Sequence, residues 1–199
     1  MNAPILGGMS VFANQTIIRV IILVVDGVSL TTVSTALEPF QQVNSMLGED
    51  RFHIQLVSLS STDPMTSAGI PIPCHLTSTD VLAKLKLQNR PDLLILCCGQ
   101  VTSPINQASA GKFVQKFVRQ NVPVFALGAA CFIAAKTAMI KGGKCTTHWK
   151  MISSLAEQFP ALEVQNVLYV LDGRISSCAG EFATFDMILA FIERIFGSR

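Results

Sequence analysis

The sequence has little charge and no apolar segment long enough to anchor it in a membrane. Charged residues make up 14% of the 199 residues, hydrophobic residues make up 50%, and the net charge is +2. The mean hydropathy is +0.47. Disordered chains have low hydropathy and high net charge, so this composition predicts one folded domain with a large core. The longest apolar stretch, residues 17–25, contains Arg19 and is far shorter than the roughly 20 residues that span a bilayer.

Signals for secretion, metal binding and nucleic-acid binding are also missing. No positively charged start precedes an apolar run in residues 1–15, so we expect a cytoplasmic protein without a membrane partner. None of the six cysteines has C-x-x-C spacing, and His53 and His75 have no second ligand at metal spacing. We therefore expect buried thiols, no metal and no cofactor. The fifteen basic residues are scattered among thirteen acidic ones, so we expect this chain alone not to bind DNA.

Apolar strands alternate with amphipathic helices along the chain. The patterns predict strands at residues 17–25, 53–59, 92–98, 122–127, 167–171 and 174–178, and helices at residues 29–46, 80–87, 107–119, 129–140, 150–159 and 181–196. This order predicts an α/β fold with a doubly wound, mostly parallel sheet and helices on both faces. Residues 70–76 contain two prolines and are expected to form an edge strand or an extended arm. Pro39 is expected to kink the first helix or to begin its second half.

Glycines follow the expected strands at the sheet edge where α/β proteins bind ligands. Gly27, Gly99 and Gly128 all stand at carboxyl ends of strands. The strand at 122–127 passes almost directly into the helix at 129–140, which is typical of a nucleophile elbow. Gly128 carries no nucleophile, however, and Cys131 comes about one helical turn later. A plain tight turn at Gly128 is the alternative interpretation.

Three side chains near these strand ends are candidates for chemistry, and each has a structural alternative. Cys131 is either a reactive thiol or a small core residue of an apolar helix. His148 has a functional interpretation, in which it orients a nucleophile or hydrogen-bonds a ligand, and a structural one, in which it packs beside Trp149. Glu38 is either a buried carboxylate that contacts a ligand or an acid favoured near a helix start.

Several blocks of the sequence together resemble a known family. Residues 128–149, GAACFIAAKTAMIKGGKCTTHW, are similar to the elbow and following segment of the ThiJ/PfpI branch of the class I glutamine amidotransferase-like superfamily. Residues 35–44 (TALEPFQQVN), 90–99 (RPDLLILCCG) and 176–189 (SSCAGEFATFDMIL) resemble the sensing domain of AraC-type transcriptional regulators. The resemblance runs from about residue 17 to residue 196. It implies a flavodoxin-like, class I glutamine amidotransferase-like fold.

The resemblance also implies roles for individual residues. Enzymes of the superfamily carry a cysteine at the elbow and an acidic residue on the first helix that touches it. The elbow position matches Gly128 and the acidic position matches Thr35, so both catalytic positions are lost. His148 matches the histidine that faces the elbow. Glu38 matches the acid of the ALEP block, which favours the regulator branch over the enzymes.

The implied function is therefore a catalytically inactive sensing domain that binds a small-molecule effector and forms a homodimer. The implied organisation is an N-terminal extension at residues 1–16, the sensing domain at residues 17–199, and a downstream helix-turn-helix domain that alone would bind DNA. Two alternatives stay open: a ThiJ/PfpI-type cysteine hydrolase or lyase that uses Cys131 with His148 as its base, and a dimerisation module without a ligand. The candidate ligand-binding residues are Glu38, Gly99, Gln100, Gly128, Ala129, Cys131, His148 and Trp149.

Overall fold

The structure, a computed structural model, describes residues 16–60, 62–84, 90–99, 103–137, 143–173 and 175–197. Most of the predicted N-terminal extension, the ends of the helices predicted at 80–87 and 129–140, and Gln100 lie outside the described residues. None of the described helices is long and apolar enough to cross a membrane.

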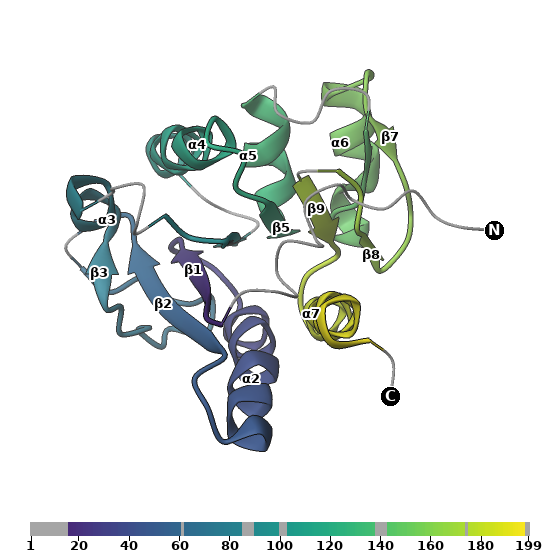
Figure 1. Cartoon of the computed structure of the whole chain (residues 1–199). Coiled ribbons are helices and arrows are strands. Elements are labelled where there is room, and N and C mark those ends of the chain that lie inside the picture. The colour runs from purple at the N-terminus through teal and green to yellow at the C-terminus, as the bar shows by residue number, and fades with distance from the viewer. Residues whose placement is uncertain are drawn as a thin grey trace.

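Helices and strands alternate through most of the described chain (Figure 1). The strands of the main sheet are β1 (Ile18–Val24), β2 (Phe52–Ser58), β3 (Leu76–Thr77), β4 (Leu93–Cys98), β5 (Val124–Gly128), β8 (Tyr169–Val170) and β9 (Ile175–Cys178). The helices are α2 (Leu30–Leu47), α3 (Ser78–Lys84), α4 (Pro104–Val118), α5 (Ala130–Lys136), α6 (Ile152–Gln158) and α7 (Phe182–Phe196), with a 3₁₀ turn at Trp149–Met151. A small separate sheet pairs β6 (Lys144–Cys145) with β7 (Glu163–Val164).

The main sheet has the order β3-β2-β1-β4-β5-β9-β8, and all neighbouring strands are parallel except β8, which pairs with β9 in an antiparallel hairpin. Its register brings the carboxyl ends of four strands to one level. Val24 pairs with Cys97, Cys97 pairs with Leu127, and Leu127 pairs with Cys178. The loops that follow these four residues therefore begin side by side, which is how the sheet assembles the site described below.

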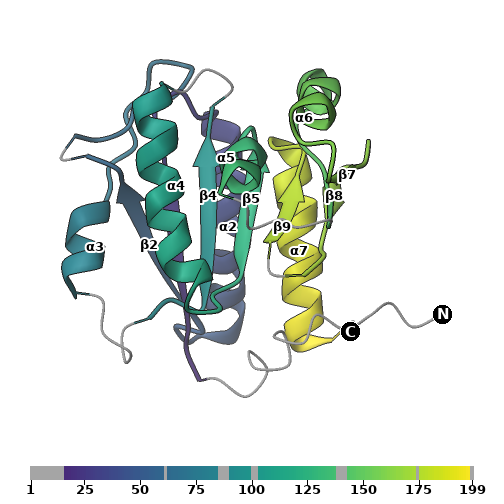
Figure 2. The ribbon, with the colours of Figure 1, turned by 90° about the horizontal axis from the view of Figure 1, so that it is seen from above.

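Helices cover both faces of the sheet, as the alternation predicts. In Figure 2, α3, α4 and α5 lie on one face, and α2 and α7 lie side by side on the other. One core lies under α2 and α7 and includes Phe40, Phe125 and Phe191, whose rings meet at centroid distances of 5.2 Å and 6.3 Å. Aromatic pairs of this kind contribute about 0.5–1.5 kcal/mol beyond their buried area. The second core lies under α4 and α5, and Cys97 and Cys98 face opposite cores, as expected for neighbours on a strand.

The structure corrects several local predictions. α2 runs through Pro39 as one helix, so Pro39 does not begin a new helix. Of residues 70–76, which are predicted to form an edge strand or an extended arm, Leu76 lies in the edge strand β3 and Pro71 makes an isolated bridge to Met65. The helix predicted at 150–159 divides into the 3₁₀ turn and α6. The β6–β7 pair was not predicted, since two-residue strands leave no periodic signal.

Candidate functional site

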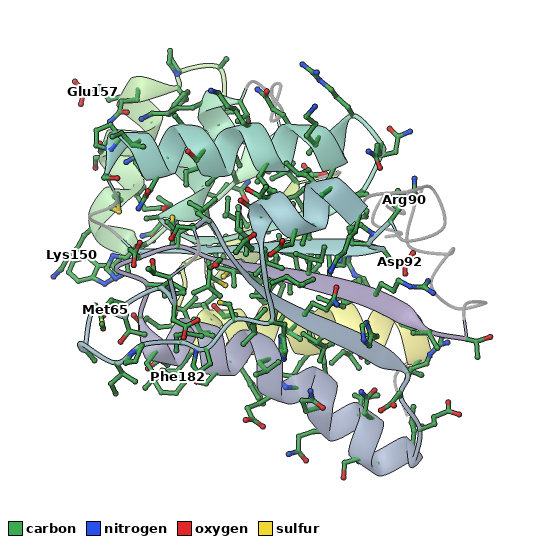
Figure 3. All side chains as sticks on the ribbon, turned by 90° about the vertical axis from the view of Figure 1, so that its left-hand side faces the viewer. Met65, Arg90, Asp92, Lys150, Glu157 and Phe182 are labelled. Atoms are coloured by element: carbon green, nitrogen blue, oxygen red, sulfur yellow. The ribbon has the colours of Figure 1, made fainter. Side chains whose placement is uncertain are left out.

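A cavity of about 370 Å³ opens beyond the carboxyl ends of β1, β4, β5 and β9. This volume lies in the range of small-molecule sites. Its lining residues are Gly27, Ser29, Thr32, Ser67, Cys98, Gly99, Leu127, Gly128, Ala129, His148, Ala179, Gly180 and Glu181. The three predicted strand-end glycines are all among them. Figure 3 labels Met65, Lys150 and Phe182, which are close in sequence to lining residues and lie at this end of the molecule. Arg90 and Asp92 lie at the opposite end.

The base of the cavity is built from glycine backbone in close contact. A Cβ atom added to Gly99 would lie 1.9 Å from the carbonyl oxygen of Gly27. A Cβ atom added to Gly180 would lie 3.2 Å from the Cα atom of Gly128. Gly180 also has a φ of +86°, which favours glycine. The ends of β1 and β4, and those of β5 and β9, can therefore approach one another only because these positions lack side chains.

Gly128 has the backbone geometry of an elbow. It is the last residue of β5, its φ is +59°, and Ala129 already caps α5. Buried Thr147 fixes the turn, because its Oγ1 donates a hydrogen bond of 2.9 Å to the Gly128 carbonyl oxygen. The predicted sharp passage from strand to helix is thus confirmed. It presents no nucleophile, because a glycine stands at its apex.

Cys131 lies one turn beyond this apex and faces away from the cavity. Its side chain is fully buried in a small third core with Ala135, Cys145 and Leu155. A hydrogen bond to Cys145, together with burial, raises the pKa of the Cys131 thiol well above its ordinary value. The same hydrogen bond lowers the pKa of Cys145. Cys131 therefore resembles the core thiol of the structural alternative, since a nucleophilic cysteine needs an accessible thiolate.

The predicted site residues divide into two groups. Gly99, Gly128, Ala129 and His148 meet at the cavity, whereas Glu38, Cys131 and Trp149 do not line it. Ligand binding by any of these residues stays a prediction, and Gln100 lies outside the described residues.

Glu38 and Trp149 are displaced from the cavity for different reasons. Glu38 is exposed in the middle of α2, so it is neither a buried carboxylate nor an acid at the helix start. Trp149 is 67% exposed; its ring stacks on His148, and the Lys150 ammonium lies 5.2 Å from its centroid. It therefore covers the outer side of His148 rather than the cavity.

His148 lines the cavity and caps the 3₁₀ turn that follows it. Its Nδ1 accepts from the backbone N–H of Lys150 at 3.4 Å, which caps the 3₁₀ turn. A neutral imidazole with an accepting Nδ1 carries its proton on Nε2.

The α2 residue that faces the cavity differs from the one expected. Thr35, matched to the family's acidic position, lies outside the cavity lining, and its Oγ1 donates 2.7 Å to the carbonyl oxygen of Thr31. Thr32, one turn earlier, is buried and lines the cavity. Neither side chain is acidic, so α2 contributes no carboxylate to the lining.

Sequence reasoning missed the polar rim. Ser29, Thr32, Ser67 and Glu181 line the cavity together with His148. Glu181 stands inside the block 176–189 that carries the resemblance, so its position directly after Ala179-Gly180 was the available signal. Among the described residues, no group of three or more His, Cys, Asp and Glu side chains is placed to hold a metal ion.

Comparison with family models matches residues 18–194 to the DJ-1/PfpI family. The chain belongs to this family. The match covers nearly the whole described region, and it confirms the ThiJ/PfpI resemblance and the flavodoxin-like fold.

The DJ-1/PfpI chain is also similar in sequence to transcriptional regulators. It is 22% identical over 187 residues to the HTH-type transcriptional regulator GlxA of Rhizobium meliloti, covering 93% of this chain and 55% of that protein. It is 25% identical over 177 residues to the HTH-type transcriptional regulator GbdR of Pseudomonas aeruginosa, covering 88% and 46%. The chain thus spans about half the length of these relatives.

Solved structures show the same fold. An AraC family transcriptional regulator from Pseudomonas putida superposes with a TM-score of 0.79 at 19% identity, covering 91% of this chain and 94% of that chain. Drosophila melanogaster DJ-1beta superposes with a TM-score of 0.72 at 14% identity, covering 92% of each chain.

Proposed function

We propose that this domain is the effector-sensing and dimerisation part of an AraC-type transcriptional regulator and that it lacks catalytic activity. The observation that carries the proposal is Gly128, which keeps the elbow backbone with a φ of +59° but presents no side chain beside the cavity of about 370 Å³. An elbow without a nucleophile leaves room for a ligand group where an enzyme would place its reactive atom. The similarity to GlxA and GbdR supports a role in regulation.

The position of Cys131 argues against the alternative of a cysteine hydrolase or lyase. Its thiol is buried behind the elbow, and its pKa is raised by the hydrogen bond to Cys145 and by burial. Such a thiol carries little thiolate and is not accessible to a substrate at the cavity. A cytoplasmic location and DNA contact through another part of the regulator fit this role and belong to the same proposal.

Ligand-dependent melting tests the sensing role. The chain is screened against a metabolite library, and a compound at 100 times its Kd should add about 2.7 kcal/mol of stability, or about 5–11 °C in Tm. Gly128→Leu should abolish this response because its side chain enters the cavity. Gly128→Ala is the matched control: it has the same backbone strain, and its Cβ would lie 3.7 Å from the nearest atom, which is ordinary contact. A compound that stabilises the Gly128→Leu protein as much as the wild type would place the site elsewhere.

The dimer part of the proposal rests on α7. Phe182, Phe185 and Leu189 are 76%, 40% and 43% exposed and follow at spacings of three and four residues, which places them on one side of the helix. Apolar stripes of this kind usually pack against a partner. Leu189→Lys should therefore lower the mass measured by sedimentation, whereas Leu82→Lys on α3 should not. A monomer mass for the wild type at micromolar concentration would remove this part of the proposal.

A further inference from the structure

Glu181, at the rim of the cavity, has a strained backbone. Its φ is +52° and its ψ is −129°, and it immediately precedes α7. Among the described residues, Asn121 is the other non-glycine residue with a positive φ. Such a conformation costs about 1–3 kcal/mol and persists only where the surroundings enforce it. The position thus holds a glutamate where a glycine would fit with less strain.

Hydroxyl groups at the start of α2 hold Glu181 in this conformation. The Thr32 Oγ1 accepts a hydrogen bond of 3.0 Å from the Glu181 N–H. The Ser29 Oγ donates a hydrogen bond of 2.9 Å to the Glu181 Oε2. The Thr35 Oγ1 lies 3.1 Å from the Glu181 carbonyl oxygen. These contacts fix both the backbone and the carboxylate at the cavity rim.

The fixed carboxylate has spare capacity to accept hydrogen bonds. A carboxylate has about four acceptor sites, and in the described part of the chain Ser29 is the one side chain that donates to the Glu181 carboxylate. The described cavity lining includes no Lys or Arg, and Glu181 is its one acidic residue. No Lys or Arg of the described lining therefore shares the rim with the Glu181 carboxylate, which favours a ligand that carries a positive charge.

We propose that the effector carries a primary or secondary ammonium group and that Glu181 binds it. This inference rests on the proposed sensing function and adds the charge of the ligand. An ammonium with N–H bonds suits the open acceptor sites of the carboxylate. A quaternary ammonium is usually held against aromatic faces, and the imidazole of His148 is the sole aromatic ring in the described lining. The rim chemistry therefore favours a hydrogen-bonding cation.

Three probes of equal chain length test this charge selection: butylammonium, butyrate and butan-1-ol. Each is titrated into the isotopically labelled domain, and the amide shifts of Gly128 and Gly180 report binding at the cavity. Since Glu181 is exposed to solvent, the charge contributes modestly, and butylammonium should bind about fivefold more tightly than butan-1-ol. Butyrate should bind more weakly than either.

Three variants separate the charge of Glu181 from its structural role. Glu181→Gln should remove the preference for butylammonium. Glu157→Gln, the same change at an exposed residue of α6, should keep it. Ser29→Ala removes the hydrogen bond that orients the carboxylate but keeps its charge, so the preference should weaken there without disappearing. If Glu181 acted only by tying α7 to α2, Ser29→Ala and Glu181→Gln would have the same effect.

The outcomes distinguish this inference from the function on which it rests. Equal binding of butan-1-ol and butylammonium at Gly128 and Gly180, or a preference that survives in Glu181→Gln, overturns the charge selection and leaves the cavity as a binding site. Absence of shifts at these amides with all three probes at millimolar concentration counts against the cavity itself, and with it against both proposals.

Discussion

Replacing Gly99 by alanine should damage the fold at the base of the cavity. The new Cβ would lie 1.9 Å from the carbonyl oxygen and 2.3 Å from the carbonyl carbon of Gly27. An ordinary C···O contact is about 3.3 Å or longer, and both partners are backbone atoms that cannot rotate away. β1 and β4 would have to separate at this end, which strains the 2.9 Å hydrogen bond from the Val25 N–H to the Cys97 carbonyl oxygen.

The expected cost of this change is about 3 kcal/mol or more, because overpacking against fixed backbone belongs to the most destabilising class of substitution. For a domain of this size the loss corresponds to a decrease in Tm of about 6–12 °C. Gly128→Ala is the matched control, because its Cβ would meet no atom closer than 3.7 Å. This substitution should cost only about 1–2 kcal/mol of stability, because alanine disfavours a positive φ. Calorimetry of both variants measures the difference. If Gly99→Ala melts within about 2 °C of the wild type, the glycine contact does not set the cavity base.

Two further predictions concern the elbow and the thiols. Thr147→Val keeps the shape of the side chain but removes the buried hydrogen bond to the Gly128 carbonyl oxygen. The free energy of unfolding measured in urea should therefore fall by about 1–3 kcal/mol. An unchanged unfolding midpoint would show that this hydrogen bond does not hold the elbow. Burial and the nearby Asp63 carboxylate raise the pKa of half-buried Cys74 to about 11. Its alkylation by iodoacetamide should therefore be slow at neutral pH, and the rate should rise about tenfold per pH unit up to about pH 10. A rate that reaches a plateau near pH 8 would contradict this pKa.

The layout of the fold was predictable because its signals are local and repeated. The sequence shows directly the all-apolar runs of β1, β4 and β5 and the three- and four-residue spacing of apolar residues in α2 and α7. Each of these elements lies within a few residues of its predicted range. The departures come from long-range contacts. The β6–β7 pair forms only when segments about 19 residues apart meet. α2 continues through Pro39, which is buried, although a proline disfavours the interior of a helix.

The cavity was predictable to different degrees at its base and at its rim. Gly27, Gly99 and Gly128 mark the ends of predicted parallel strands, and the parallel topology is enough to bring them together. Thr32 and Glu181 are 149 residues apart and meet through a hydrogen bond that no local pattern contains. Glu38 is a site candidate in the sequence because of its place on the first helix and its match to the family block, but in the structure its side chain is exposed.

This division between base and rim also bears on how such a cavity selects its ligand. At the base, Gly99 and Gly180 are in close backbone contact with Gly27 and Gly128, so a side chain added at either position disturbs the fold before it changes binding. The rim side chains Ser29, Ser67, His148 and Glu181 come from loops and helix starts that follow different strands, and they can change without disturbing the sheet. If the cavity binds an effector as proposed, exchange of rim residues would change its ligand more readily than exchange of base residues. Glu181, held in a strained conformation by hydrogen bonds from the first turns of α2, is the one acidic residue of the described rim and is therefore the position at which such a change would be tested first.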